Sequence, residues 1–293
     1  MKKIGIAAAA LVLAAAWMTA AAAEVTALPV DLSGGMPYRP ESCLSETRYE
    51  DESLRVEITE QMVDTTRVVI ARVRIADPSQ LRTAPAYAFD RDQTAPMTAI
   101  AQRVNAVLAI NGDYYSYQAA RGGYMIRQGV QYINRPIRGR DVLIIDGRGD
   151  FHIEHEITKD TPAKYEELGG IVNSFNFGPG LVVDGVVLNR FKFAHNASET
   201  KAARSCIAQV KRGEPEYLCI VTESSDDSVG GGLTLEQFTG FVASLGVENA
   251  YNLDGGNSAA LIYLGEKITS VDDRDHRPLS DIIYFASAVK EEM

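Results

Sequence analysis

The chain has 293 residues, with 29 Lys or Arg against 39 Asp or Glu, so its formal net charge at pH 7 is −10. This acidic balance disfavours nucleic acid and anionic lipid as partners, because their phosphate groups attract net positive protein. With 46% hydrophobic residues and no linker, low-complexity tract or charge block, the sequence predicts one domain with a full core.

The first residues have the pattern of a secretory signal peptide, which we assign to residues 1–23. Two lysines precede an apolar, Ala-rich run, and three alanines follow as a small-residue cleavage site. A membrane anchor is the alternative, but the run is short and no stop-transfer charges follow it. We therefore expect cleavage between Ala23 and Glu24, a secreted or periplasmic protein, and no membrane insertion afterwards.

Residues 24–50, rich in Pro, Gly and Ser towards their start, predict an extended N-terminal arm, and residues 51–293 predict the folded domain. Apolar residues have a spacing of two in Leu54–Thr59 and in Arg67–Ile75, which predicts two strands. Thr94 and Pro96 predict a helix start with Thr94 as the N-cap, and this helix runs to about residue 105. A buried strand, Val107–Ile110, follows.

Two strands of this sequence end in similar polar segments. Val107–Ile110 leads into Asn111-Gly112-Asp113. Thr234 and Gln237 form the capping box of a helix, and the strand after it leads through Tyr251 into Asn252-Leu-Asp-Gly-Gly-Asn-Ser258. Ligands of open α/β sheets bind beyond the carboxyl ends of strands, so we expect the two polar ends to converge on one site. The alternative interpretation is that each polar segment is only a tight turn between strands.

The segments between these ends predict further strands and turns. Gly123–Val130 is typical of a hairpin, Asp141–Ile145 of a buried strand, and Asn176–Gly185 of a glycine-punctuated strand. Phe151–Ile157 alternates with His152 among the polar residues on one face, which we interpret as a solvated face rather than a metal site. The predicted fold class is α/β (mixed α+β): a single domain with mixed twisted sheets and a few flanking helices.

The chain contains three cysteines, Cys43, Cys206 and Cys219. Export would permit disulfides. Cys206 and Cys219 are equally distant from the Arg212–Gly213 centre of a polar turn, so a symmetric hairpin would place their sulfurs opposite each other. A reduced, buried pair fits the sequence equally well.

Several of these segments, in this order, resemble the phosphodiester glycosidase family. This is the domain of the enzyme that removes N-acetylglucosamine caps from mannose 6-phosphate tags, and of many exported bacterial proteins. The segments are Ala109–Tyr115, Phe177–Gly185, Ala203–Ile207, Gly232–Glu236, Asn252–Ser258 and Arg277–Ser280. The chain departs from the family pattern at Asn257 and Ala208, where Gly is usual, and at Glu223-Ser-Ser225, where the family has Asp-Gly-Arg.

The resemblance implies hydrolysis of the C1–O bond of a sugar-1-phosphodiester. The leaving phosphate monoester has a second pKa of about 6, so it needs less help from a protonating acid than an ordinary glycoside does. A carboxylate must instead stabilise the oxocarbenium-like centre or activate water. Asp254 is the first choice for this role and Asp113 the second, and Glu223 is a candidate second acid. His195 is either a general acid or a surface histidine.

The substrate-binding residues that we expect surround these acids. Arg204 would clamp the phosphate bidentately, the backbone N–H groups after Asp254 would form an anion nest, and the two Asn side chains would bind sugar hydroxyls. The full set is Asn111, Gly112, Arg204, Asn252, Gly255, Gly256, Asn257 and Ser258. We expect no cofactor; a bound cation would be Ca²⁺ or Mg²⁺, because the site offers oxygen ligands.

Two other functions fit the same residues. One is a carbohydrate-binding or cell-envelope polysaccharide assembly module without turnover, with stacking surfaces from Tyr114, Tyr115, Tyr117, Tyr124 and Tyr132. The other is a metal-dependent phosphodiesterase built on Asp113, Asp254 and Glu223. Turnover of a sugar phosphodiester would distinguish a glycosidase from the binding module. The identity of the bond that breaks would distinguish a glycosidase from the phosphodiesterase.

Overall fold

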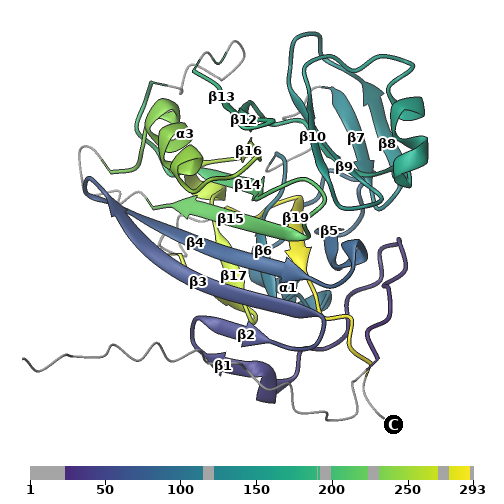
Figure 1. Ribbon diagram of the computed structural model, residues 1–293, viewed down its shortest axis with the longest axis vertical. Coiled ribbons are helices and arrows are strands. Elements are labelled where there is room, and N and C mark those ends of the chain that lie inside the picture. Colours follow the sequence, from purple (N-terminus) through teal and green to yellow (C-terminus); the bar gives the residue numbers. More distant parts are fainter. Residues whose placement is uncertain are drawn as a thin grey trace, which may run out of the picture.

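The computed structural model describes residues 24–114, 122–189, 191, 199–223, 231–269 and 277–290. The expected signal peptide, Tyr115, Tyr117 and His195 lie outside the described residues. The described strands form a nine-stranded sheet, a five-stranded sheet and two smaller sheets of three and two strands. Figure 1 shows how they are arranged in space. Among the described residues, every pairing between named strands is antiparallel.

The nine-stranded sheet contains, in spatial order, β1 (Cys43–Ser45), β2 (Arg48–Glu50), β3 (Leu54–Val63), β4 (Thr66–Ile75), β15 (Glu216–Thr222), β14 (Ser205–Gln209), β16 (Asn249–Leu253), β12 (Gly180–Val183) and β13 (Val186–Val187). The five-stranded sheet contains β18 (Glu266–Lys267), β17 (Leu261–Tyr263), β6 (Leu108–Asn111), β19 (Asp281–Phe285) and β5 (Leu81–Pro85). The smaller sheets contain β10 (Phe151–Glu154), β9 (Val142–Asp146) and β11 (Ile171–Phe175), and the hairpin of β7 (Gly123–Arg127) and β8 (Val130–Arg135).

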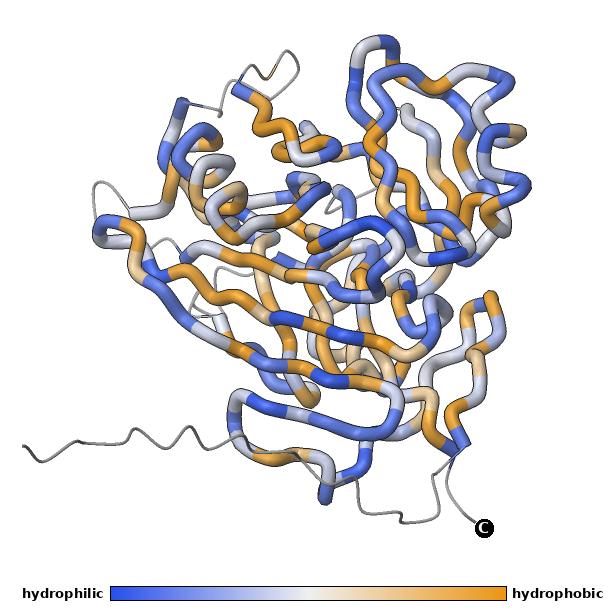
Figure 2. Tube along the Cα trace, in the orientation of Figure 1, coloured by the Kyte–Doolittle hydropathy of each residue, from blue (hydrophilic) through white to orange (hydrophobic). Residues whose placement is uncertain are grey.

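The main core lies between the two large sheets. Ala71, Cys219 and Ile207 of the nine-stranded sheet belong to the same buried cluster as Leu108 and Ile283 of the five-stranded sheet. Figure 2 shows hydrophobic and hydrophilic residues alternating along β3, which has one face towards this core. The predicted period of two is confirmed in β3, where burial of one face explains it. In β4, Val69, Ala71 and Val73 face the main core, and Val68 and Ile70 on the other face belong to a second buried cluster.

Among the described residues, two short α-helices cover the outer faces of these sheets. α3 (Leu235–Ser244) packs Phe238 and Val242 against the nine-stranded sheet, and α1 (Met97–Arg103) packs Ile100 against the five-stranded sheet. The predicted mixed class with flanking helices holds in outline, but the fold is mostly β. The expectation of an open α/β sheet is wrong, because hairpins and antiparallel returns connect the strands where crossover helices would be needed.

The helix starts show one correct prediction and one error. Thr234 caps α3, its hydroxyl accepting from the N–H of Gln237 in a complete capping box. Thr94, in contrast, does not cap α1, whose N-cap is Pro96. Ala95 forms an antiparallel bridge with Leu279, so the chain is still extended where the sequence indicated a cap.

The structure decides between the two alternatives for Cys206 and Cys219: it shows the reduced pair and no disulfide between them. Both thiols are free and buried. Cys206 lies opposite Ile220, so the hairpin of β14 and β15 is centred on Gly213 rather than between Arg212 and Gly213. A shift of one residue turns a side chain to the other face of a sheet. Cys206 consequently packs beneath α3 and Cys219 packs in the main core.

The ends of the described chain lie side by side. Val25 forms an antiparallel bridge with Val289, and Met36 forms another with Ser287. Within the expected arm 24–50, the last residues form a 3-10 helix, Pro40–Ser42, and the strands β1 and β2, which extend the nine-stranded sheet beyond β3. No helix among the described residues combines the length and the apolar content needed to cross a bilayer.

Candidate active site

The structure brings the two polar strand ends together. Asn111, the last residue of β6, is 1% exposed and its Nδ2 donates to the carbonyl oxygen of Asp254 at 2.8 Å. Its Oδ1 accepts from Ser205 Oγ at 2.8 Å, so the same side chain also contacts β14. The two ends meet across the packed faces of two sheets, where the sequence had indicated neighbouring ends within one sheet. Asn111 therefore joins the five-stranded sheet to the nine-stranded sheet at this edge.

The turn after β16 is shaped by its glycines. A Cβ on Gly255 would lie 2.6 Å from the carbonyl oxygen of Ala203, and Gly256 has a φ of +58°. The N–H of Gly256 donates to Ala203 O at 2.9 Å, and the N–H of Ser258 donates within the turn to Gly255 O at 3.2 Å. Of the expected anion nest, only the N–H groups of Gly255 and Asn257 have no acceptor among the described residues. Asp254 itself is half-buried, and Asn257 is exposed.

Two buried polar atoms near this turn are unsatisfied among the described residues. They are Oδ1 of Asn252 and Oγ of Ser258. The Nδ2 of Asn252 does have a partner, Gly178 O at 2.8 Å, which holds the side chain in place. An unpaired buried polar group costs about 1–3 kcal/mol, so a second hydrogen-bonding group supplied by a ligand would be favoured at either atom.

Asp113 serves the protein's own backbone. It is 5% exposed, and its carboxylate accepts from the N–H of Asn176 at 2.9 Å and from the N–H of Phe177 at 2.5 Å. One of its oxygens lies 3.5 Å from Arg127 Nη2. These contacts hold the segment that follows β11 against the end of β6.

Arg127 and Asp281 complete a buried charged cluster with Asp113. Arg127 is fully buried and its Nε and Nη2 lie 3.1 and 3.0 Å from Asp281 Oδ2, while its guanidinium carbon lies 4.3 Å from the ring centroid of Phe175. Asp281 Oδ1 accepts from the N–H of Asp113 at 3.2 Å. Burial raises the pKa of Asp281, and the charge of Arg127 acts in the opposite direction. Neither residue was identified from the sequence, because neither belongs to one of the two polar strand ends.

Arg204 and Glu223 lie along the same sheet edge as Asp254 but have partners of their own. Arg204 Nε donates to Leu233 O at 2.9 Å and Nη2 to Thr200 O at 2.6 Å, and burial lowers the pKa of this guanidinium. Glu223 forms an ion pair with Arg67. Since β15 and β16 flank β14, Glu223 and Asp254 are separated by about two strand spacings, roughly 10 Å.

Tyr114 and Arg140 form a further part of the site, and Arg140 was missed by the sequence analysis because no motif contains it. Arg140 Nη1 donates to Tyr114 Oη, and its guanidinium carbon lies 5.9 Å from the centroid of that ring. The Tyr114 ring lies 5.1 Å from the ring of Phe177. The pKa of Tyr114 is raised, chiefly by burial and next by the charge of Asp113; Arg140 opposes the increase and Asp254 adds to it. The Tyr114 side chain is thus held between Arg140 and Phe177.

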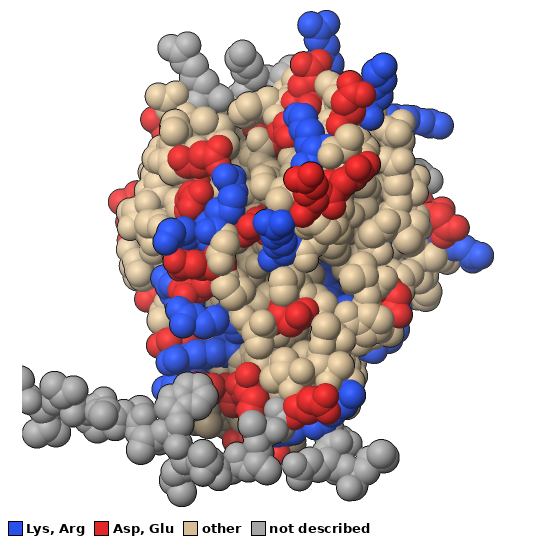
Figure 3. Space-filling model, turned by 45° about the vertical axis from the view of Figure 1, so that its right-hand side comes forward, with Lys and Arg blue, Asp and Glu red and all other residues tan. Residues whose placement is uncertain are grey.

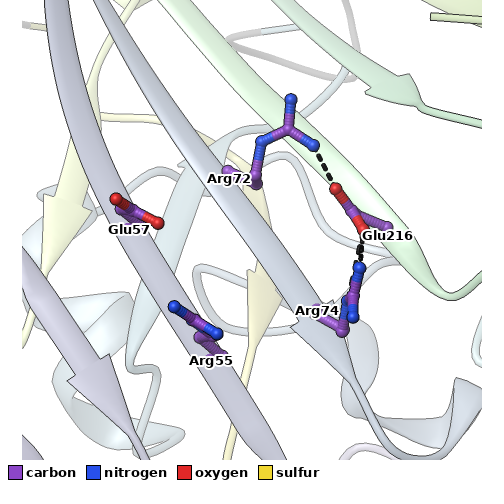
Figure 4. Close-up of a pocket in the computed structure, with 5 residues that line it drawn as sticks. All are labelled: Arg55, Glu57, Arg72, Arg74 and Glu216. Atoms are coloured by element: carbon purple, nitrogen blue, oxygen red, sulfur yellow. Dashed lines mark hydrogen bonds and ion pairs between the residues drawn. The ribbon is translucent and has the colours of Figure 1, made fainter. Parts of the chain in front are cut away.

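A hollow on the nine-stranded sheet is separate from this site. It has a volume of about 130 Å³ and is lined by Arg55, Glu57, Arg72, Arg74 and Glu216, as Figure 4 shows. Glu216 pairs with both Arg72 and Arg74. Glu216 is the first residue of β15. The candidate active site adjoins the other end of that strand, about 20 Å away. Figure 3 shows basic and acidic side chains interspersed over one face of the molecule.

The groups proposed for a metal ion are not gathered into a cluster. Among the described residues, no group of three or more His, Cys, Asp or Glu side chains is arranged to hold a metal ion. Asp113 contacts Arg127 and Glu223 contacts Arg67, so each of these acids faces a guanidinium.

Comparison with known proteins gives a family and a fold. The model of the phosphodiester glycosidase family matches residues 104–286, and no curated protein sequence matches the chain. The catalytic domain of zebrafish N-acetylglucosamine-1-phosphodiester alpha-N-acetylglucosaminidase, auto-inhibited by its pro-peptide, is similar in structure, with a TM-score of 0.60 at 17% identity over 86% of this chain and 87% of that one. A hypothetical protein from Synechocystis gives a TM-score of 0.59 at 16% identity, over 80% of this chain and 62% of that one. At these identities the two structures show the fold alone.

Proposed function

The chain belongs to the phosphodiester glycosidase family, and we propose on that basis that it hydrolyses the glycosidic C1–O bond of a sugar-1-phosphodiester. One observation supports this assignment above the others: the hydrogen bond between Asn111 and the backbone of Asp254 brings both polar strand ends to one place. A half-buried carboxylate there adjoins a turn with two N–H groups that have no acceptor among the described residues.

Asp254 is the carboxylate that we assign to the reaction. As the C1–O bond breaks, its electron pair leaves with the phosphate oxygen, and positive charge develops at C1 and the ring oxygen. Asp254 either stabilises this charge or takes the proton of the water whose oxygen bonds to C1. The products are the free sugar and a phosphate monoester, and the proton released from water ends on the monoester or in solvent.

The remaining residues divide into ligand-binding and supporting groups. Oδ1 of Asn252 and Oγ of Ser258 suit sugar hydroxyls, because both atoms are buried without a partner among the described residues. The N–H groups of Gly255 and Asn257 suit the phosphate. We assign Asp113 a supporting role, because its oxygens bind the backbone of the neighbouring segment.

We also propose that the protein acts outside the cytoplasm. The basic start, the apolar run and the alanines of residues 1–23 support export, and they lie outside the described residues. N-terminal sequencing of exported material should begin at Glu24. A membrane fraction that retains Met1 would contradict cleavage.

Incubation of the purified protein with a panel of sugar-1-phosphodiesters in water labelled with heavy oxygen tests the proposed reaction. C1–O cleavage places the label in the anomeric hydroxyl of the free sugar and leaves the phosphate monoester unlabelled. Label in the phosphate would show P–O cleavage, and the enzyme would then be a phosphodiesterase. Binding of the sugars without turnover of any compound would favour the carbohydrate-binding module.

A further inference from the structure

We infer that Arg140 binds the phosphate of the substrate and thereby makes the site selective for phosphodiesters over neutral glycosides. The inference deepens the proposed function and rests on it. An anionic substrate that approaches Asp254 is repelled by its carboxylate, so the repulsion must be offset by a nearby cation whose hydrogen-bond donors are available. The guanidinium groups around the site differ in this respect.

Arg140 has donors to offer. Its side chain is half-buried, and among the described residues its one hydrogen-bond partner is Tyr114 Oη. A guanidinium carries five N–H donors in a planar fork that matches a phosphate group. Arg204 and Arg127 instead direct donors at backbone carbonyls, and Arg127 also pairs with Asp281. Arg140 is therefore better suited to the phosphate than Arg204, the residue expected from the sequence.

The backbone fixes the position of Arg140 from both sides. On one side the N–H of Arg140 closes a turn on Ile137 O at 3.2 Å. On the other side, Asp141 Oδ2 accepts from the N–H of Gly180 at 2.9 Å and Asp141 O accepts from Tyr251 Oη at 2.7 Å. Tyr251 is on β16, three residues before Asp254. The turn with Arg140 is thus attached to the strand that carries the proposed catalytic carboxylate.

The chain provides a matched control two residues away. Arg138 carries the same charge in the same turn, but it is exposed, and no ion pair or hydrogen bond of its side chain is found among the described residues. If only the net charge of the turn matters, substitutions at Arg138 and Arg140 will have equal effects. If the position of the guanidinium matters, only Arg140 will respond.

The experiment compares Arg140→Met, Arg140→Lys and Arg138→Met with the wild type. The substrates are the best sugar-1-phosphodiester of the panel and an aryl glycoside of the same sugar, and inorganic phosphate is the inhibitor. Loss of a charge-assisted bidentate contact should lower kcat/KM for the phosphodiester by about 30-fold or more in Arg140→Met and weaken phosphate inhibition similarly. The aryl glycoside should lose far less. Arg140→Lys should fall between, because it keeps the charge without the fork.

Three results would overturn the inference. These are equal losses on both substrates, no loss on either, or the same loss in Arg138→Met as in Arg140→Met. If the wild type turns over neither substrate, the proposed function fails, and calorimetric binding of phosphate to wild type and Arg140→Met still tests Arg140. Unchanged affinity in that measurement would also refute its role.

Discussion

The buried cluster of Asp113, Arg127 and Asp281 makes a quantitative prediction about stability. Arg127→Met removes the one positive charge that we find between two carboxylates, which are 5% and 1% exposed. Met fills much of the space beside Phe175, but it loses both the charge and the hydrogen bonds from Arg127 to the carbonyl oxygens of Ile126 and Ser174. One carboxylate must then take up a proton or remain charged and unpaired in the interior.

The cost follows from the burial of all three side chains. Breaking a buried ion pair by removing one partner destabilises by about 3–5 kcal/mol. For a chain of this length, 1 kcal/mol corresponds to about 2–4 °C in thermal midpoint, so the midpoint should fall by about 6–20 °C. Differential scanning calorimetry or thermal unfolding followed by circular dichroism measures this decrease directly.

The decrease should depend on pH with a defined sign. Burial already raises the pKa of Asp281 in the wild type, and Arg127 counteracts part of the increase. An acid with a raised pKa in the folded state contributes stability that is fully present below its unfolded pKa and is lost as pH rises through its folded pKa. Without Arg127 that pKa rises further. The thermal midpoint of the variant should therefore lie closer to that of the wild type at about pH 5 than at about pH 8.

Arg82→Met is the matched control. Arg82 is also fully buried, but it donates to backbone carbonyls and to Tyr284 Oη, and its one acidic partner, Asp31, has a 52% exposed side chain. Removal of Arg82 leaves no buried carboxylate unpaired, so the decrease in thermal midpoint of Arg82→Met should not be smaller at acidic pH. If Arg127→Met shows the same decrease at both pH values, the reasoning about the stranded carboxylates is refuted.

Three further predictions concern single side chains. Asp254→Asn should lower kcat by about 100-fold or more with little change in KM and an unchanged thermal midpoint, and near-full turnover would make Asp254 a turn residue only. Thr234→Ala should destabilise by about 1 kcal/mol through loss of the α3 cap, whereas Thr234→Ser should have almost no effect in the same unfolding assay. Cys206 and Cys219 should both react as thiols when the protein is unfolded without reductant, and a mapped disulfide peptide would show that their register is wrong.

Local patterns in the sequence predicted the parts of the fold that depend on neighbouring residues. The alternation in β3 follows from burial of one face, and the cap of α3 needs only Thr234 and Gln237. The two polar strand ends were also visible as sequence. That they meet was an expectation, and the contact between Asn111 and Asp254 confirms it.

The remaining features depend on residues far apart in the chain. Ala95 pairs with Leu279, a contact that no local signal could reveal, and it displaces the start of α1. Cys206 and Cys219 would lie opposite each other only if the β14–β15 turn were centred between Arg212 and Gly213. The turn is centred on Gly213, so the two side chains lie on opposite faces of the sheet. Arg140 reaches the site from a turn with no recognisable motif, so only the three-dimensional contact with Tyr114 identifies it.

The bridge between Val25 and Val289 makes the described chain almost a closed ring. The N–H of Thr26 donates to Ala288 O at 3.0 Å, so the two end segments run side by side with the usual spacing of paired strands. A short linker could therefore join them, and new ends could be opened at the Gly213 turn, which lies at the end of β14 remote from the proposed catalytic carboxylate. Such a circular permutant would keep the contacts of the site, while β15 and β16 would be synthesised before β3 and β4, the strands that now precede them.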